Sequence, residues 1–249
     1  MTEMPITPTQ PPDTPRLNTG EVHIWRFSTA ALTPALAALL TNTEREQADS
    51  LRLEKVRLQY SASRACLRHV LSLYTGLPPS DLTFTTNACG KPSLANTPGP
   101  AFNLTHSGGL GLIAVYAGTT VGVDIEHSRR KDKLAGIAAR VFSQSELATL
   151  QSLPTESQPT AFYRLWTIKE AVLKAAGCGF SISPVEMDTG TCITPPPGME
   201  RLTVLLPDHG SWAVTAFSAA DGYPAAVAVP HDMPLSLSFY NLENETPPC

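Results

Sequence analysis

The chain carries the same order of segments twice, helical sequence followed by strand-like sequence, and this repeat is the strongest constraint on its fold. After an alternating strand-like segment at 21–27, the first round has helical sequence at 32–51 and 52–76 and strands at 81–86, 101–105, 111–117 and 120–126. The second round has helical sequence at 132–142, 143–153 and 158–177 and strands at 201–206, 211–217, 224–229 and 235–240. This order predicts an α+β fold made of a pseudo-twofold pair of similar α+β halves, each a small, mostly antiparallel sheet packed with helices.

The repeat also predicts the domain organisation. Residues 1–20 are expected to be a disordered Pro/Thr-rich tail, and residues 241–249 a flexible C-terminus. The N-terminal half is assigned to residues 21–119 and the C-terminal half to residues 120–240, and a ligand site is expected between them. A short turn around Gly118 predicts that strands 111–117 and 120–126 form a hairpin.

Composition and charge exclude several classes of protein. A net charge of −4 gives no global basic field, so we expect no nucleic-acid partner. Apolar runs are far shorter than the roughly 20 residues of a membrane span, and the N-terminus lacks the features of a signal peptide, so no membrane association is expected. The five cysteines show no metal-binding spacing and indicate reduced thiols in a cytoplasmic protein.

The strand at 120–126 has two contrasting faces. Val121, Val123 and Ile125 alternate on one face, which suits a core, and Gly122 lies on the other beside Asp124 and Glu126. Neighbouring carboxylates on one face repel each other unless a cation lies between them, and Mg²⁺ takes such oxygen ligands. The alternative is a solvated end of an edge strand, where charge discourages aggregation.

The helix at 158–177 places a carboxylate beside a lysine. Glu170 and Lys174 have the i, i+4 spacing of a favourable ion pair, which by itself could be an ordinary surface pair. Phe162, Trp166 and Leu173 add an apolar surface beside them. The pair is therefore expected to line a partly buried rim, where Glu170 completes a metal site or acts as a base and Lys174 meets a phosphate.

Positive charge is concentrated in the second helical segment. Arg57, Arg64 and Arg68 form one stripe, and Arg52 and Lys55 lie just before it, so this segment holds five of the 18 Lys and Arg residues. We expect the stripe to bind phosphate, although a solvated helix face is the common alternative.

Two loops add further polar candidates. Lys91 lies in a Gly/Pro turn, which is expected to present it to solvent or ligand. His106 and Ser107 follow a strand and precede a glycine pair, where the backbone can approach a ligand closely. A single histidine is more often structural, so this motif is weak in isolation.

Taken in order, the motifs VGVDIE, FSQSE and WTIKEAVLKAAGCG resemble the signature of the 4′-phosphopantetheinyl transferase superfamily. GKPSL and FNLTHSGG resemble additional motifs of its two-halved, monomeric Sfp-type branch, and the resemblance runs from about residue 21 to 230. It implies a holo-carrier-protein synthase, of the EC 2.7.8 class. Such an enzyme moves phosphopantetheine from coenzyme A to a serine of an apo carrier protein and releases adenosine 3′,5′-bisphosphate.

The resemblance also implies residue roles. Asp124, Glu126 and Glu170 would hold Mg²⁺, with Mn²⁺ as an alternative, and the catalytic set would be Asp124, Glu170 and Lys174. The base would be Glu170, Glu146 or a metal-bound water. The residues implied to contact coenzyme A are Lys91, Thr105, His106, Lys169 and Lys174, with Arg52, Arg57 or Arg64. The choice among Arg52, Lys55 and Arg57 for the 3′-phosphate stays open, because these residues do not align cleanly with the family pattern.

The implied partners are coenzyme A and an acyl or peptidyl carrier protein, from fatty-acid, polyketide or nonribosomal-peptide synthesis, with secondary metabolism favoured. Segments 129–133 and 162–166 are candidate docking regions, although 129–133 also suits a solvated loop. A monomer is expected because one chain supplies both halves. The alternatives are a non-catalytic coenzyme A or nucleotide-binding module of the same fold, and a different Mg²⁺-dependent phosphate enzyme.

Overall fold

The computed structural model describes residues 5–95, 97–128, 134–187, 189, 200–232 and 235–242, and it confirms the predicted α+β class. The first half contains β1 (Glu21–Ser28), α1 (Pro34–Ala38), α2 (Asn42–Ser50), α3 (Glu54–Thr75), η1 (Pro79–Asp81), β2 (Phe84–Thr86), β3 (Pro92–Leu94), β4 (Ala101–Ser107) and β5 (Leu110–Tyr116). The second half contains β6 (Gly122–Ile125), α4 (Leu134–Val141), α5 (Gln144–Ser152), α6 (Gln158–Ala176), η2 (Gly179–Ser181), η3 (Pro184–Glu186), β7 (Glu200–Leu206), β8 (Gly210–Ala220) and β9 (Tyr223–Pro230), and β10 (Ser236–Asn241) follows.

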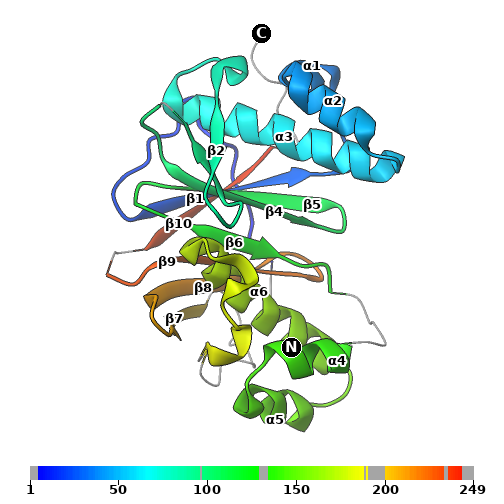
Figure 1. Ribbon diagram of the computed structural model, residues 1–249, viewed down its shortest axis with the longest axis vertical. Helices are drawn as coiled ribbons and strands as arrows, with labels where there is room; N and C mark the ends of the chain where they lie inside the picture. The colour runs from blue at the N-terminus through cyan, green and yellow to red at the C-terminus, as the bar shows by residue number, and fades with distance from the viewer. Residues whose placement is uncertain are drawn as a thin grey trace.

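The two main sheets lie face to face between two long helices, with α3 on the outside of one sheet and α6 on the outside of the other (Figure 1). The strand orders are β10-β1-β5-β4 and β6-β9-β8-β7, and β2 and β3 form a small separate hairpin. β10 pairs with β1 in parallel, so the strand expected at 235–240 joins the first sheet and not the second.

The hairpin predicted between strands 111–117 and 120–126 is wrong. β5 pairs with β1 and β4, whereas β6 pairs with β9 in the other sheet. The true hairpin is β4–β5, in which Ser107 pairs with Leu110 and Gly108 takes a left-handed φ of +63° in the turn. The segment around Gly118 instead carries the chain from one sheet to the other.

The core lies between the sheets and continues from one half into the other. Val22 and Ile24 of β1 pack in it with Val123 and Ile125 of β6 and with Val121 just before β6, all at 0–1% exposure. The predicted apolar face of strand 120–126 is therefore confirmed. Its opposite face is directed toward α6, which forms its own apolar layer with β8 and β9.

Residues 5–20, predicted as a disordered tail, lie along the body of the protein. The Ile6 backbone N–H donates to the Ser218 carbonyl at 2.9 Å, and Thr9 forms a bridge with Tyr240 on the free side of β10. Residues 1–4, the 129–133 segment and the predicted flexible end from 243 onward are outside the described residues.

Candidate active site

Strand β6 lies directly against helix α6 because its first residue is a glycine. A Cβ atom at Gly122 would be 2.0 Å from the Ala171 carbonyl oxygen and 2.3 Å from the Ala175 nitrogen. No side chain fits there, and the alanines keep the helix surface flat. This close approach brings residues of β6 within hydrogen-bonding distance of the helix.

Asp124 and Lys174 are the central pair of the site. The Lys174 Nζ lies 2.6 Å from Asp124 Oδ1, and Asp124 is 4% exposed. The Thr105 hydroxyl donates to the same carboxylate oxygen at 3.1 Å and accepts from Lys174 at 3.2 Å. The sequence predicted that Lys174 would pair with Glu170, but the ion pair in the structure joins the helix to β6.

Strand β4 forms a seam with β6 through its side chains. Asn103 Oδ1 accepts from the Val123 backbone N–H at 2.9 Å, and Ser107 Oγ donates to Glu126 Oε2 at 2.8 Å. With Thr105, these residues alternate along one face of β4. The spacing Asn-x-Thr-x-Ser is visible in the sequence, yet it does not tell which strand lies opposite.

The site carries more negative charge than positive. Burial and the negative charge of Asp124 raise the pKa of Glu170 to about 7; Lys174 opposes this, and Glu126 adds to it. Burial also raises the pKa of Asp124, against the effect of Lys174. The buried Oδ2 of Asp124 has no hydrogen-bond partner among the described residues.

These donors fit a divalent cation that takes oxygen ligands, although no ready-made cage is present. Within the described ranges, no group of three or more His, Cys, Asp or Glu side chains is arranged to hold a metal ion. Asp124, Glu126 and Glu170 nevertheless influence one another electrostatically, and one buried carboxylate oxygen is unpartnered. Carboxylates with such uncompensated charge are the ligands that Mg²⁺ prefers.

Helix α3 of the first half reaches the site through a histidine. Gln59 Nε2 lies 2.9 Å from His106 Nδ1. Partial desolvation and, to a smaller extent, the positive charge of Lys174 lower the pKa of His106. The predicted contact of His106 with coenzyme A stays a prediction.

The structure directs Lys91 toward oxygen atoms of its own chain. Its ammonium donates to the Thr120 hydroxyl at 2.5 Å, the Ala175 carbonyl at 2.9 Å and the Val121 carbonyl at 3.0 Å. The sequence predicted exposure to solvent or ligand. Lys91 nevertheless lines a cavity together with Lys174, so its predicted contact with coenzyme A stays a prediction.

Lys169 and Glu146 form a buried pair away from Asp124. Their charged atoms are 2.6 Å apart, and each residue is at most 2% exposed. Lys169 also donates to the carbonyls of Val141 and Pro184, and Thr189 donates to Glu146. These contacts place both residues in the α4–α5–α6 layer, so the predicted ligand contact of Lys169 and the predicted role of Glu146 as a base find no support here.

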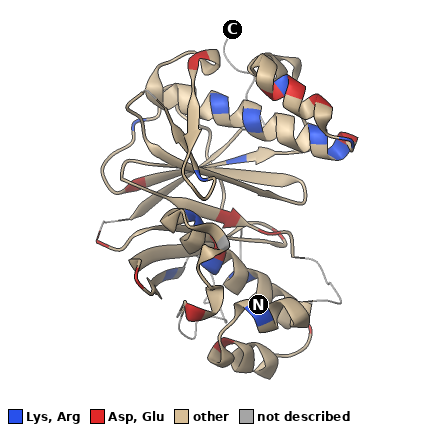
Figure 2. Cartoon of the chain, in the orientation of Figure 1, with Lys and Arg blue, Asp and Glu red and all other residues tan. Residues whose placement is uncertain are grey.

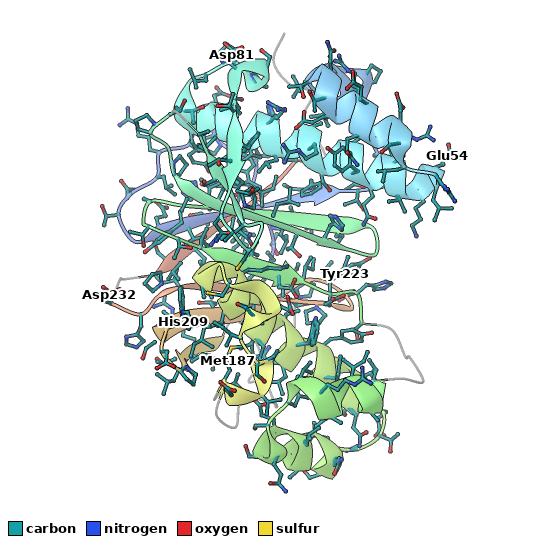
Figure 3. The ribbon with its side chains drawn as sticks, viewed as in Figure 1. Glu54, Asp81, Met187, His209, Tyr223 and Asp232 are labelled. Atoms are coloured by element: carbon teal, nitrogen blue, oxygen red, sulfur yellow. The ribbon has the colours of Figure 1, made fainter. Side chains whose placement is uncertain are left out.

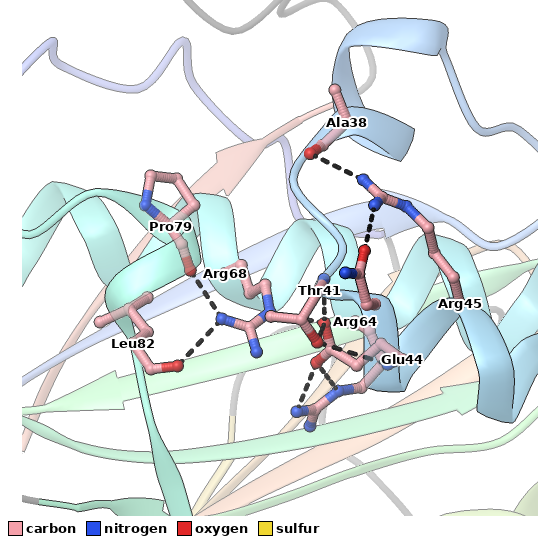
Figure 4. A network of polar contacts seen from close by, with 9 residues as sticks. Ala38, Thr41, Glu44, Arg45, Arg64, Arg68, Pro79 and Leu82 are labelled. Carbon is pink, nitrogen blue, oxygen red and sulfur yellow. Dashed lines mark hydrogen bonds and ion pairs between the residues drawn. The ribbon is translucent and has the colours of Figure 1, made fainter.

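The basic stripe of α3 is divided in two. Glu44 of α2 accepts from Arg64 and from Arg68, with ion-pair distances of 2.7 Å for both, and Arg68 also donates to the carbonyls of Pro79 and Leu82 (Figure 4). The predicted phosphate contact of Arg64 would have to compete with this ion pair.

The remaining basic residues lie at the exposed N-terminal end of α3, where Figure 2 shows Lys and Arg positions in blue. Glu54 labels the same end of the helix in Figure 3. Arg52, Lys55 and Arg57 are all exposed, and Arg57 donates to the Leu51 carbonyl at 3.3 Å. Which of these three residues contacts the 3′-phosphate of coenzyme A therefore stays open.

The docking region predicted at 162–166 is largely interior. Phe162, Tyr163, Arg164 and Leu165 are at most 3% exposed, and Trp166 is half-buried. In the described part of the chain, no helix is both long and apolar enough to cross a bilayer.

Comparison with known proteins identifies the family of the chain. A model of the 4′-phosphopantetheinyl transferase superfamily matches residues 120–228, which run from β6 to within β9. The chain is 33% identical to the 4′-phosphopantetheinyl transferase HetI of Nostoc sp. over 226 residues, which cover 88% of this chain and 92% of HetI. It is 31% identical to the transferase Sfp of Bacillus subtilis over 71% of this chain and 76% of Sfp, and 33% identical to psf-1 of Bacillus pumilus over 70% and 74%.

The chain therefore belongs to the 4′-phosphopantetheinyl transferase superfamily, and the predicted family and class of enzyme are confirmed. The family implies coenzyme A and a carrier protein as the two substrates.

Proposed function

We propose that this enzyme transfers 4′-phosphopantetheine from coenzyme A to a serine hydroxyl of an apo carrier protein, with Mg²⁺ and with release of adenosine 3′,5′-bisphosphate. The observation that carries the proposal is the set of Asp124, Glu170 and Lys174 at the seam between the halves, where carboxylates exceed cations. A pyrophosphate with a divalent cation matches that balance of charge.

Asp124, Glu126 and Glu170 are the residues that would hold the cation, with Mn²⁺ as an alternative. When bound, a divalent cation neutralises charge that develops on phosphate oxygens during transfer. Its arrival would offset the mutual repulsion of the three carboxylates. Mg²⁺ together with coenzyme A should therefore raise the melting temperature.

Lys174 is assigned to the phosphate that is transferred. Its ammonium is half-buried and lies against Asp124, so an incoming phosphate oxygen can bind it while a cation takes over the carboxylate. A fixed positive charge there stabilises the transition state more than the ground state. Thr105, which accepts from Lys174, and His106, whose pKa the charge of Lys174 lowers, are proposed to contact the phosphates of coenzyme A.

Glu170 is proposed as the base that accepts the proton of the carrier serine. Glu170 is half-buried beside Asp124 and Lys174, and in the protein without a cation its pKa is raised to about 7, within the range in which a carboxylate accepts a proton near neutral pH. A water molecule on the cation is the alternative base. If Glu170→Gln keeps near-normal kcat and only weakens Mg²⁺ binding, Glu170 is a ligand and not the base.

The proposed partner is an apo acyl or peptidyl carrier protein from fatty-acid, polyketide or nonribosomal-peptide synthesis, and the proposed setting is the cytoplasm, with the enzyme acting as a monomer. Arg52, Lys55 and Arg57 are kept as candidates for the 3′-phosphate. Their role can be tested with 3′-dephospho-coenzyme A. Substitution of a residue that binds the 3′-phosphate should raise KM for coenzyme A but not for the dephosphorylated substrate.

The deciding experiment mixes the protein with coenzyme A, Mg²⁺ and each type of apo carrier, and measures the carrier mass. We expect one phosphopantetheine added per carrier, no addition with EDTA, and a loss of roughly 10²–10³-fold in kcat for Lys174→Met. Binding of coenzyme A without transfer to any carrier would contradict the proposal and favour a non-catalytic binding module.

A further inference from the structure

The turn between β2 and β3 is built to reach from the first half into the second. Asn87 shapes it: its side-chain oxygen accepts from the backbone N–H groups of Cys89 at 3.0 Å and Lys91 at 2.9 Å. Gly90 takes the left-handed φ of +83° that the turn requires. The small hairpin thus presents two long polar side chains, Asn87 and Lys91, in fixed directions.

Both side chains contact the C-terminal end of α6. Asn87 Nδ2 donates to the Gly177 carbonyl at 2.8 Å, and Lys91 donates to the Ala175 carbonyl at 2.9 Å. Carbonyl groups at a helix C-terminus have no partner within the helix and attract cations. Space is tight here, since a Cβ at Gly177 would lie 3.0 Å from Asn87 Nδ2 and 3.2 Å from Lys91 Cδ.

Lys91 also holds the chain that leads into β6. It donates to the Val121 carbonyl at 3.0 Å and to the Thr120 hydroxyl at 2.5 Å. Thr120 in turn donates to the Ala175 carbonyl at 2.6 Å, which closes the network. An ammonium group has three N–H donors, and these three oxygens use all of them.

The two segments that Lys91 joins are the ones that carry the central ion pair. Ala175 follows Lys174 directly, and Val121 is three residues before Asp124. Sliding of α6 along β6 would change the separation of Lys174 and Asp124, and a clasp at their common end opposes that motion. A misplacement of about 1 Å can cost roughly 10²-fold in rate.

We propose that Lys91 is a positioning residue, which clasps the end of α6 to the start of β6 and so sets the geometry of Lys174 and Asp124. This inference rests on the proposed function, because it concerns the rate of the same transfer. It replaces the predicted contact with coenzyme A, since that contact would require the ammonium to leave three oxygen atoms.

The test compares Lys91→Met with Ser93→Ala, a control at an exposed position on the adjoining strand β3. We expect Lys91→Met to lower kcat roughly tenfold or more while KM for coenzyme A stays within about twofold. Asn87→Asp keeps the acceptor that shapes the turn and removes the bond to Gly177, so it should lower kcat in the same direction by less. Ser93→Ala should change neither parameter.

Two kinetic results would overturn the proposal. A raised KM for coenzyme A with unchanged kcat would show a ligand contact, and a lowered melting temperature with normal kcat and KM would show a merely structural bond. If Lys91→Met does not fold, Thr120→Val removes one acceptor and the same comparison applies.

Hydrogen exchange separates this proposal from the proposed function, because it needs no turnover. If Lys91 has this role, Lys91→Met should speed amide exchange in 171–177 and in β6 relative to wild type. The increase there should exceed any increase in β1 and β5. Equal exchange throughout would refute the clasp even in an inactive enzyme, whereas wild-type protein that fails to modify any carrier would refute the function alone.

Discussion

Each half contains a helix that begins with a capping box, but the two capping boxes are connected to different partners. Thr41 starts α2 and Ser143 starts α5, each as part of a capping box completed by a glutamate three residues later. In both halves that glutamate is buried and forms an ion pair with a basic side chain of the following long helix. In the first half Glu44 meets two arginines of α3, and in the second Glu146 meets Lys169 of α6.

The halves differ in how the charge of a glutamate is balanced. Burial alone would raise the pKa of Glu44, but hydrogen bonds from Arg68 and Thr41 and the charge of Arg64 outweigh it, and its pKa is lowered. In the second half, Glu170 is close to other carboxylates and its pKa is raised to about 7. Glu44 is therefore compensated within the fold, whereas Glu170 keeps uncompensated charge that a ligand can balance.

The largest contrast is expected for the two basic partners. Lys169→Met leaves Glu146 as an uncompensated buried charge and should lower the free energy of unfolding by about 3–5 kcal/mol. Arg64→Met leaves Glu44 paired with Arg68 and should cost about 1 kcal/mol, because Arg64 is partly exposed. Urea denaturation measures both losses.

The same variants test the predicted contacts with coenzyme A. If Lys169 and Arg64 serve folding alone, KM for coenzyme A stays unchanged in the fraction that is folded. Equal losses of stability in the two variants would mean that the two halves do not differ in the way described.

A second contrast concerns how closely strand and helix approach. Gly122→Ala forces a methyl group against the backbone of Ala171 and Ala175, which should cost about 1–3 kcal/mol and lower kcat by displacing Asp124. Gly136→Ala on α4 is the control, since a Cβ atom added there would meet nothing within 4 Å. That change should stabilise the protein by about 0.4–1 kcal/mol. Thermal and urea unfolding distinguish them, and a tolerated Gly122→Ala would contradict the close packing.

Much of the fold could be predicted from local pattern. Alternation identified every strand of the two main sheets, and the apolar face of β6 was correct, because these features depend on neighbouring residues. The helical segment predicted at 52–76 ends at Gly76, which caps α3 with a left-handed φ of +69°. The pairing of β6 with β9 and the sheet to which β10 belongs could not be predicted, because a short turn and an alternating strand do not specify a distant partner.

The site could be predicted in part for the same reason. The motifs indicated Asp124, Glu170 and Lys174, and the structure brings them together. The spacing of α3 indicated one face for Arg64 and Arg68, but not that Glu44 from another helix lies against it. A side chain's destination depends on tertiary packing, so residue type alone suggested phosphate where the structure has a carboxylate.

The pH dependence of stability should have opposite signs for the two glutamates. In protein free of divalent cations, the pKa of Glu170 is raised by folding, so the folded state favours the protonated carboxyl group. The contribution of Glu170 to stability is therefore complete below about pH 4.5 and is lost as pH rises through about 7. The free energy of unfolding of Glu170→Gln, relative to that of wild type, should therefore rise by about 1–2 kcal/mol from about pH 4 to pH 8, a value reduced for partial exposure. Stability curves in EDTA measure it.

Glu44 provides the matched case. Its lowered pKa means that its contribution is present above about pH 4.5 and is lost as pH falls. The deficit of Glu44→Gln should accordingly shrink in acid, while that of the Glu170 variant changes at neutral pH. Parallel curves for both variants would show that the two halves hold their carboxyl groups in similar surroundings.

The smallest effects are expected at the caps themselves, where the halves are most alike. Thr41→Ala and Ser143→Ala each remove the hydroxyl that accepts from the N3 backbone N–H, a loss of about 1 kcal/mol. Thr41 also donates to Glu44 at 3.1 Å, so its loss should be the larger of the two. Thr33→Ala at the five-residue helix α1 should cost about 0.5 kcal/mol, since little helix depends on that cap. If Ser143→Ala instead causes the largest loss of stability, the capping box of α5 supports the buried Glu146–Lys169 pair as well as the helix end. The two capping boxes would then be alike in sequence but not in their contribution to stability.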